Sequence, residues 1–139
     1  MSVERKNGQR GRDDACLMAR IAEDFRGKET IVLDLTEITP VFDYFVITTG
    51  NSPRQLRALA EEVRQTMKGR GNRPLGEEGD ERSAWILQDY GDVVLHAFLS
   101  EARTLYDLEH LWSDARVVDW KQELCVPAAA ETTEVELGT

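Results

Sequence analysis

Side chains that commonly perform chemistry are sparse in this sequence. Histidine occurs only as His96 and His110, and cysteine only as Cys16 and Cys125. A metal site needs several ligands that converge, and the chain has neither an HxxxH pair nor a CxxC pair. We therefore expect no metal and no cofactor, and we interpret His96 as a half-buried, hydrogen-bonded strand residue, with a place on a binding surface as the alternative. Both cysteines are expected to be reduced thiols, with one long-range disulfide as the alternative.

Gly50–Pro53 is the segment of the chain that most resembles a phosphate-binding loop. It follows a predicted strand and precedes a predicted helix, where backbone N–H groups can receive phosphate. However, the GxxxxGK[ST] and GxGxxG patterns are both absent, and Ser52 with Gln55 has the form of a helix-capping pair. A catalytic serine is disfavoured as well, because the chain contains no GxSxG segment.

Nucleotidyl transfer would also need carboxylates that converge on Mg²⁺. Glu78 and Asp80 lie in an expected loop. Asp107 and Glu109 lie on an expected helix, where a step of two residues turns the side chains apart. These residues favour a protein that is not an enzyme, and a metal-dependent nucleotidyltransferase-like enzyme is the alternative.

Apolar periodicity predicts three helices and five strands. The first helix begins after Asp13 or Asp14 and ends at Gly27, because apolar residues between them recur every fourth position. A second helix runs from Pro53 to Gly69, and a third follows Ser100 and carries Trp112. Runs of β-branched, aromatic and aliphatic residues predict strands over 30–35, 43–49, 84–89, 93–99 and 117–120. Tyr90-Gly91 is typical of the turn of a compact hairpin, and residues 70–82 are expected to form an exposed loop.

This order of elements predicts an α/β fold in which helices accompany a single-layer mixed sheet. Residues 1–12 are polar and 123–139 are acidic and aperiodic, so we predict a flexible tail at each end of a domain over 13–122.

Overall charge excludes several classes of partner. The chain has 17 basic and 26 acidic side chains, for a net charge of −9, which opposes binding to nucleic acid. Its apolar runs, such as 93–95, are too short to span a bilayer, and no apolar stretch follows the basic N-terminus. We expect a cytoplasmic protein without a membrane or sequence-specific nucleic-acid partner.

The predicted sheet carries more apolar surface than one layer of helices covers. Strand 93–99 is apolar on both faces, so both faces need a cover. Three helices can cover one side of such a sheet well and the other only in part, so the remaining apolar face is a candidate docking surface for a protein, with Trp85 and Tyr90 near it. The alternative is a helix that crosses to the second face and completes the core.

Three groups of strings carry a resemblance to a known family. They are DYFVI with TGNS within 43–52, EG at 78–79 followed by WILQDYGDVV at 85–94 with His96 and Phe98, and R..YDLE.LW at 103–112. In order and spacing, over about residues 14–120, they closely resemble the Iojap-like ribosomal silencing factors (RsfS). The VVHVF string typical of that family corresponds to VVLHAF at 93–98, either by one inserted residue or by a different alignment around His96.

The resemblance implies a nucleotidyltransferase-like α/β fold that has lost its catalytic acids. It also implies a factor that binds the large ribosomal subunit through its fourteenth protein. Bound there, such a factor sterically blocks joining of the small subunit and represses translation. The family further implies a homodimer when the protein is free.

The family's contact region corresponds to the hairpin and its surroundings. The candidate partner-binding residues are Trp85, Leu87, Asp89 and Tyr90, with Glu78, Arg103 and Tyr106 beyond the hairpin. Aromatic side chains commonly anchor an interface, and carboxylates select a basic partner. For Leu87 and Tyr106, packing in the core is the alternative.

Overall fold

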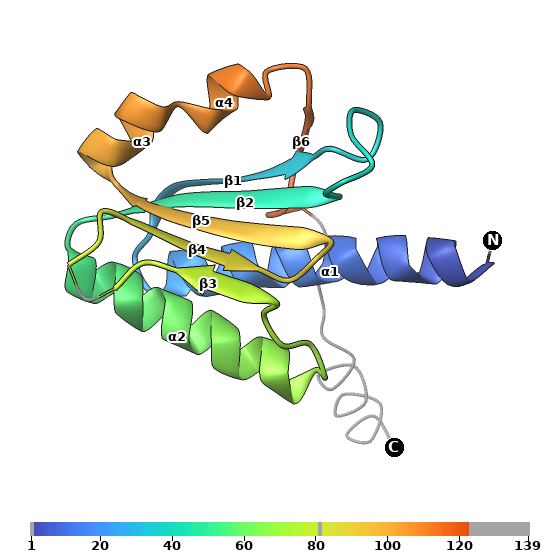
Figure 1. Ribbon diagram of the computed structural model, residues 1–139, viewed down its shortest axis with the longest axis horizontal. Helices are drawn as coiled ribbons and strands as arrows, with labels where there is room; N and C mark the ends of the chain where they lie inside the picture. Colours follow the sequence, from blue (N-terminus) through green and yellow to red (C-terminus); the bar gives the residue numbers. More distant parts are fainter. Residues whose placement is uncertain (1, 81, 123–139) are drawn as a thin grey trace.

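Two strands that are buried almost throughout form the centre of the protein. In the computed structural model, which describes residues 2–80 and 82–122, β2 (Tyr44–Gly50) and β5 (Val93–Leu99) pair in parallel. Tyr44 lies opposite Val93, and Gly50 lies opposite Leu99. Both strands are apolar on both faces, as is typical of strands that other elements cover on each side (Figure 1).

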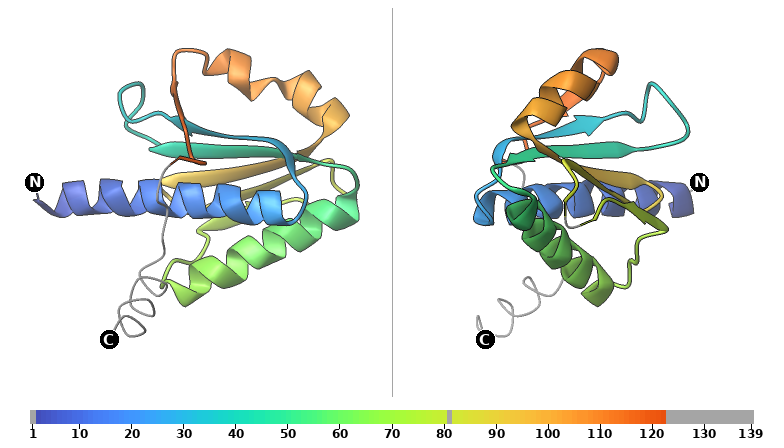
Figure 2. Two further views of the ribbon diagram at one scale, coloured as in Figure 1. Left: turned by 180° about the vertical axis from the view of Figure 1, so that it is seen from behind. Right: turned by 60° about the vertical axis from the view of Figure 1, so that its left-hand side comes forward.

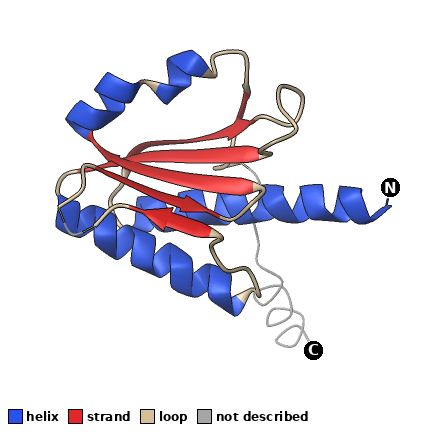
Figure 3. Cartoon of the chain, in the orientation of Figure 1, coloured by secondary structure: helices blue, strands red, loops and turns tan. Residues whose placement is uncertain are grey.

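These strands belong to a six-stranded sheet, whose strands are red in Figure 3, with the order β3-β4-β5-β2-β1-β6. On one side, β1 (Lys28–Asp34) and β6 (Arg116–Val118) extend the sheet in antiparallel pairs. On the other side, β4 (Trp85–Asp89) and β3 (Gly76–Glu78) do the same. The mixed α/β sheet is confirmed, whereas likeness to nucleotidyltransferases remains a prediction.

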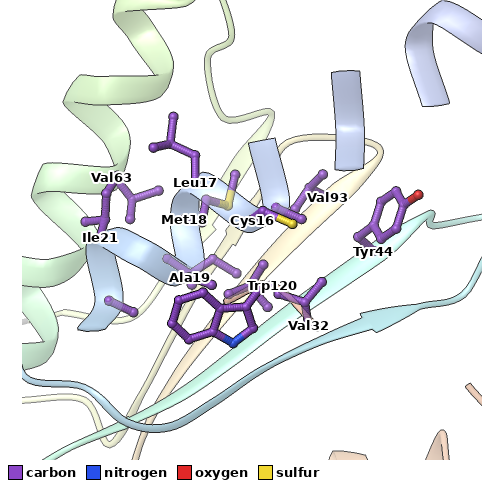
Figure 4. Close-up of a cluster of buried hydrophobic side chains, with 14 of the residues drawn as sticks. Cys16, Leu17, Met18, Ala19, Ile21, Val32, Tyr44, Val63, Val93 and Trp120 are labelled. Atoms are coloured by element: carbon purple, nitrogen blue, oxygen red, sulfur yellow. The ribbon is translucent and has the colours of Figure 1, made fainter. Parts of the chain in front are cut away.

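The first face of the sheet, as we call it, is covered by α1 (Ser2–Asp24) and α2 (Pro53–Gly69) (Figure 2). Met18 of α1 and Val63 of α2 are fully buried against sheet residues such as Val32 and Val93 (Figure 4). Trp120, which follows β6, closes this core, and its Nε1–H donates to the Thr30 carbonyl oxygen at 2.9 Å. Ser52 caps α2 as predicted, because its Oγ accepts from the Gln55 backbone N–H at 3.1 Å.

The start predicted for the first helix was wrong, because α1 begins at Ser2 rather than after Asp13 or Asp14. Residues 2–12 lack an apolar period, but most of them are Arg, Lys, Glu or Gln, which propagate a helix well. Gly11 lies against the sheet end: a Cβ atom there would be 2.9 Å from Asp92 Oδ2. The segment predicted as an N-terminal tail is thus helical from Ser2. The acidic tail predicted for 123–139 lies outside the described residues, and the domain bounds stay a prediction.

The second face is covered by α3 (Ser100–Tyr106) and α4 (Leu108–Leu111) (Figure 2). A single helix was predicted here, but Asp107 adopts a left-handed backbone conformation, with φ 47° and ψ 56°, and divides it. Aspartate tolerates this conformation better than most residues. The predicted loop 70–82 likewise contains β3, which at three residues is too short for periodicity to reveal.

Within residues 2–80 and 82–122, no helix has both the length and the apolar composition required to cross a lipid bilayer.

Candidate protein-docking face

Alternate residues of β4 lie on the second face of the sheet. Trp85 lies opposite Phe98 of β5, and Leu87 lies opposite both His96 of β5 and Glu78 of β3. Because side chains on paired strands point the same way when they lie opposite each other, these residues share one face. The chain therefore places an apolar row along β4 beside aromatic residues of β5, with an acidic residue on the edge strand.

Tyr106 of α3 completes an aromatic cluster on this face. Its ring centroid lies 4.5 Å from that of Trp85, which in turn lies 5.0 Å from Phe98. Phe45 of β2 contacts His96 edge-on, with centroids 4.6 Å apart. The cluster thus joins four elements whose residues are distant in sequence.

The cover of this face is incomplete. Trp85 and Leu87 are only half-buried, and the Tyr106 side chain is 51% exposed. Leu105 of α3 and Leu111 of α4 are 77% and 70% exposed. A helix does cross to the second face, as the alternative held, but the short α3 and α4 leave apolar side chains in contact with water.

Two of the remaining predicted residues, Asp89 and Glu78, also lie on this face. Asp89, the third residue of β4 that points this way, is partly buried, and its Oδ1 accepts from the Gly91 backbone N–H at 2.8 Å. Glu78 is exposed. We call Trp85, Leu87, Asp89, Glu78 and Tyr106 the docking face.

Arg103 lies at the end of the sheet and is 8% exposed. Its guanidinium donates to Glu109 Oε2 at 2.8 Å and to Thr49 Oγ1 at 2.8 Å, which ties α3 to α4 and to β2. Arg103 therefore helps to hold α3, the helix that carries Tyr106, and adds little exposed surface of its own.

Tyr90 does not lie on the docking face, contrary to the sequence-based expectation. The turn is centred on Gly91 and Asp92, because the Tyr90 backbone N–H donates to the Val93 carbonyl oxygen at 2.8 Å. Tyr90 therefore continues β4 by one residue and turns its side chain to the first face, where it is 5% exposed. Its hydroxyl donates to Gln88 Oε1 at 2.8 Å, and burial raises the pKa of Tyr90.

His96 is a hydrogen-bonded strand residue, as predicted, but it is buried rather than half-buried, with 4% of its surface exposed. Trp85 Nε1–H donates to His96 Nδ1 at 3.2 Å. Burial lowers the pKa of His96 to about 4, so the ring is neutral at pH 7 and its proton is on Nε2. In the part of the chain that the structure describes, Nε2 has no hydrogen-bond partner. The hairpin register places His96 diagonally across from Trp85 rather than directly opposite it.

Backbone N–H groups at the Gly50–Pro53 loop and the start of α2 already donate to nearby side-chain oxygens. Gln55 Oε1 accepts from the Asn51 backbone N–H at 2.6 Å, and Ser52 Oγ accepts from the Gln55 backbone N–H. A phosphate would have to displace both oxygens. Across residues 2–80 and 82–122, no three His, Cys, Asp or Glu side chains are arranged to hold a metal ion. The geometry of the loop is that of a helix start.

Comparisons with known proteins point to one family. Residues 9–137 match the family described as "Ribosomal silencing factor during starvation" (RsfS). The chain is 43% identical over 90 residues to the ribosomal silencing factor RsfS of Chromobacterium violaceum, covering 65% of this chain and 74% of that protein. For RsfS of Bacillus subtilis the identity is 38% over 103 residues, covering 74% and 87%. A crystal structure of a Chromobacterium violaceum protein superimposes with a TM-score of 0.71 at 39% identity, covering 74% of this chain and 86% of that one.

Proposed function

Because this chain belongs to the RsfS family of ribosomal silencing factors, we propose that it represses translation by keeping the two ribosomal subunits apart. It binds the large subunit through that subunit's fourteenth protein, in the cytoplasm, and occupies space that the small subunit needs. The mechanism is steric and requires no bond to be made or broken.

The observation that carries this proposal is the incomplete cover of the second face. Trp85, Leu87 and Tyr106 form an apolar centre, and Glu78 and Asp89 form an acidic rim. An apolar centre with a polar rim is the usual anatomy of a protein interface. The acidic rim and the net charge of −9 favour a basic partner, as proteins that contact ribosomal RNA commonly are.

The same face supports a second copy of the chain as its occupant when ribosomes are absent. Half-buried Trp85 and exposed Leu105 would be covered in a homodimer, which removes apolar surface from water. We therefore propose that the free protein is a homodimer.

Co-sedimentation with purified large subunits tests the proposal. The wild-type protein is expected to pellet with large subunits and, when added first, to reduce the formation of joined ribosomes. Excess small subunit added first should lower the bound fraction. If the protein does not pellet with large subunits, or joins the pellet equally when the subunits are already joined, the proposed function is wrong.

The face itself is tested by removing its two aromatic side chains, half-buried Trp85 and exposed Tyr106. Trp85→Ala combined with Tyr106→Ala is expected to weaken co-sedimentation by at least about 30-fold, because central aromatic anchors often contribute 2 kcal/mol or more. Val117→Ala is the matched control, since Val117 is an apolar residue that is 68% exposed on β6, at the far edge of the sheet. Unchanged binding by the double variant, with a native circular dichroism spectrum, would refute the assignment of the face.

A further inference from the structure

The hydrogen bond between Trp85 and His96 links the docking face to a side chain beneath it. Trp85 lies opposite Phe98 and His96 lies opposite Leu87, so the two residues are diagonal neighbours on adjacent strands. Long aromatic side chains can reach across this diagonal. Trp85 Nε1–H meets His96 Nδ1 at 3.2 Å, and His96 is almost completely buried while Trp85 is half-buried.

This bond restricts how the indole ring of Trp85 can lie. Its other close neighbours, Phe98 and Tyr106, contact it through ring faces and edges, and such contacts are compatible with several ring orientations. A hydrogen bond from Nε1 is directional and selects one of them. It also gives the indole N–H an acceptor, which the ring needs once a partner covers it and water is excluded.

We infer that His96 is a positioning residue of the docking face: its neutral Nδ1 holds the Trp85 indole in the orientation that the partner contacts. The inference rests on the proposed function, because it names the residue that prepares that face for docking. His96 itself touches no partner, since its side chain is covered.

The surroundings of His96 keep it in the form that accepts a hydrogen bond. The titratable groups on this face include Asp89 in β4, Glu78 in β3, Arg103 and Tyr106 in α3, and Glu109 in α4, which is paired with Arg103. On the β2 side the neighbours are Phe45, Ile47 and Thr49, which carry no charge. The pKa of His96 is lowered by burial. A protonated ring would present an N–H group to the indole N–H, and the bond would be lost.

Two substitutions at position 96 separate positioning from packing. His96→Asn places an amide oxygen near the position of Nδ1 and keeps an acceptor, whereas His96→Leu is similar in volume to the ring but has no acceptor. Co-sedimentation with large subunits at pH 7 is expected to fall about tenfold for His96→Leu and to stay within about threefold of wild type for His96→Asn. Equal losses in both variants, or no loss in either while Trp85→Ala loses binding, would overturn the inference and leave the proposed function in place.

Trp85→Phe tests the donor side of the hydrogen bond, because it keeps an aromatic ring but removes the N–H group. It should lose binding to about the same extent as His96→Leu, and the two changes together should lose no more than either alone. Additive losses would show that His96 acts independently of Trp85 and would contradict the inference.

A spectroscopic measurement tests the positioning without any ribosome. In nuclear magnetic resonance spectra at pH 7, the indole N–H of Trp85, assigned by its absence in Trp85→Phe, should exchange with water more slowly than in His96→Leu, by about tenfold or more. His96→Asn should restore slow exchange. Equal exchange in wild type and His96→Leu would overturn the inference. Failure of the wild-type protein to bind ribosomes would contradict the proposed function. The exchange rate of the indole N–H would still decide whether His96 holds the Trp85 ring.

Discussion

Asp89 and Tyr90 are adjacent in sequence, but their side chains lie on opposite faces of the sheet. Asp89 points to the docking face, whereas Tyr90, one position later, points into the core between α1 and the sheet. Because alternation places neighbours on opposite faces, a shift of one residue in the predicted turn exchanges a surface contact for a core residue. Of the two tyrosines predicted for the partner-binding site, it is Tyr106 of α3 that lies beside Trp85.

Tyr90→Phe is expected to change stability and leave docking unchanged. The Tyr90 hydroxyl donates to Gln88 Oε1, and Gln88 is 1% exposed, so the variant leaves a buried amide oxygen without this donor. We predict a loss of about 1–3 kcal/mol in the free energy of unfolding, measured by urea denaturation. Co-sedimentation of the folded variant should match wild type. A loss of binding at unchanged stability would indicate instead that Tyr90 contacts the partner.

His96 should make the protein less stable in acid. Its pKa of about 4 in the folded state lies below the ordinary value of 6.5, so the unfolded chain binds the proton more tightly. Stability contributed by the neutral ring is therefore complete above about pH 6.5 and is lost as the pH falls toward 4. Burial raises the pKa of Asp43 and Asp92, which has the opposite effect on stability, so the comparison must isolate His96.

The measurement is the difference in unfolding free energy between wild type and His96→Asn, followed from pH 7 to pH 4. Wild type should lose about 3 kcal/mol more than the variant across this range. The carboxylates contribute equally to both proteins and cancel. Parallel curves for the two proteins would show that His96 is not buried and neutral in solution.

At the scale of elements, the helices and strands that could be predicted from the sequence are those that bury a regular set of apolar side chains. Strands β2 and β5 are buried along nearly their whole length and are recognisable as continuous runs of apolar and β-branched residues, whereas α2 repeats its buried positions at helical spacing. The first half of α1 is uniformly polar, β3 has three residues, and the break at Asp107 is one backbone conformation. None of these leaves a period in the sequence. The docking residues on β4 were identified from the resemblance. The hydrogen bond from Trp85 to His96 became visible only in the structure.

The loop between β2 and α2 should not bind nucleotides. Asn51 N–H and Gln55 N–H already donate to side-chain oxygens, so a phosphate gains no unpaired backbone donor from this pair. We predict that titration with nucleoside triphosphate and Mg²⁺ in a calorimeter shows no saturable heat. Ser52→Ala should cost about 1 kcal/mol of stability through the lost cap. Saturable binding that Ser52→Ala abolishes would instead favour the nucleotidyltransferase-like enzyme.

At the scale of the molecule, charge should guide the encounter with the ribosome. The net charge of −9 would repel ribosomal RNA, so productive approach depends on acidic groups of the docking face meeting a basic protein. Glu78 is the exposed acidic residue on that face. Glu62 of α2 is also exposed but belongs to the helix layer on the opposite side of the sheet.

Glu78→Lys and Glu62→Lys make the same change in net charge at these two places. If net charge alone governs binding, both variants should bind large subunits more tightly than wild type, because both reduce repulsion from RNA. If local complementarity governs it, Glu78→Lys should bind about tenfold more weakly at low salt, and Glu62→Lys should not. The deficit of Glu78→Lys should shrink at high salt, since the screening length falls from about 8 Å at physiological salt to about 3 Å at 1 M. Association kinetics measured on immobilised large subunits across a salt series decide between the two, and tighter binding by both variants would exclude the acidic rim as the element that selects the partner.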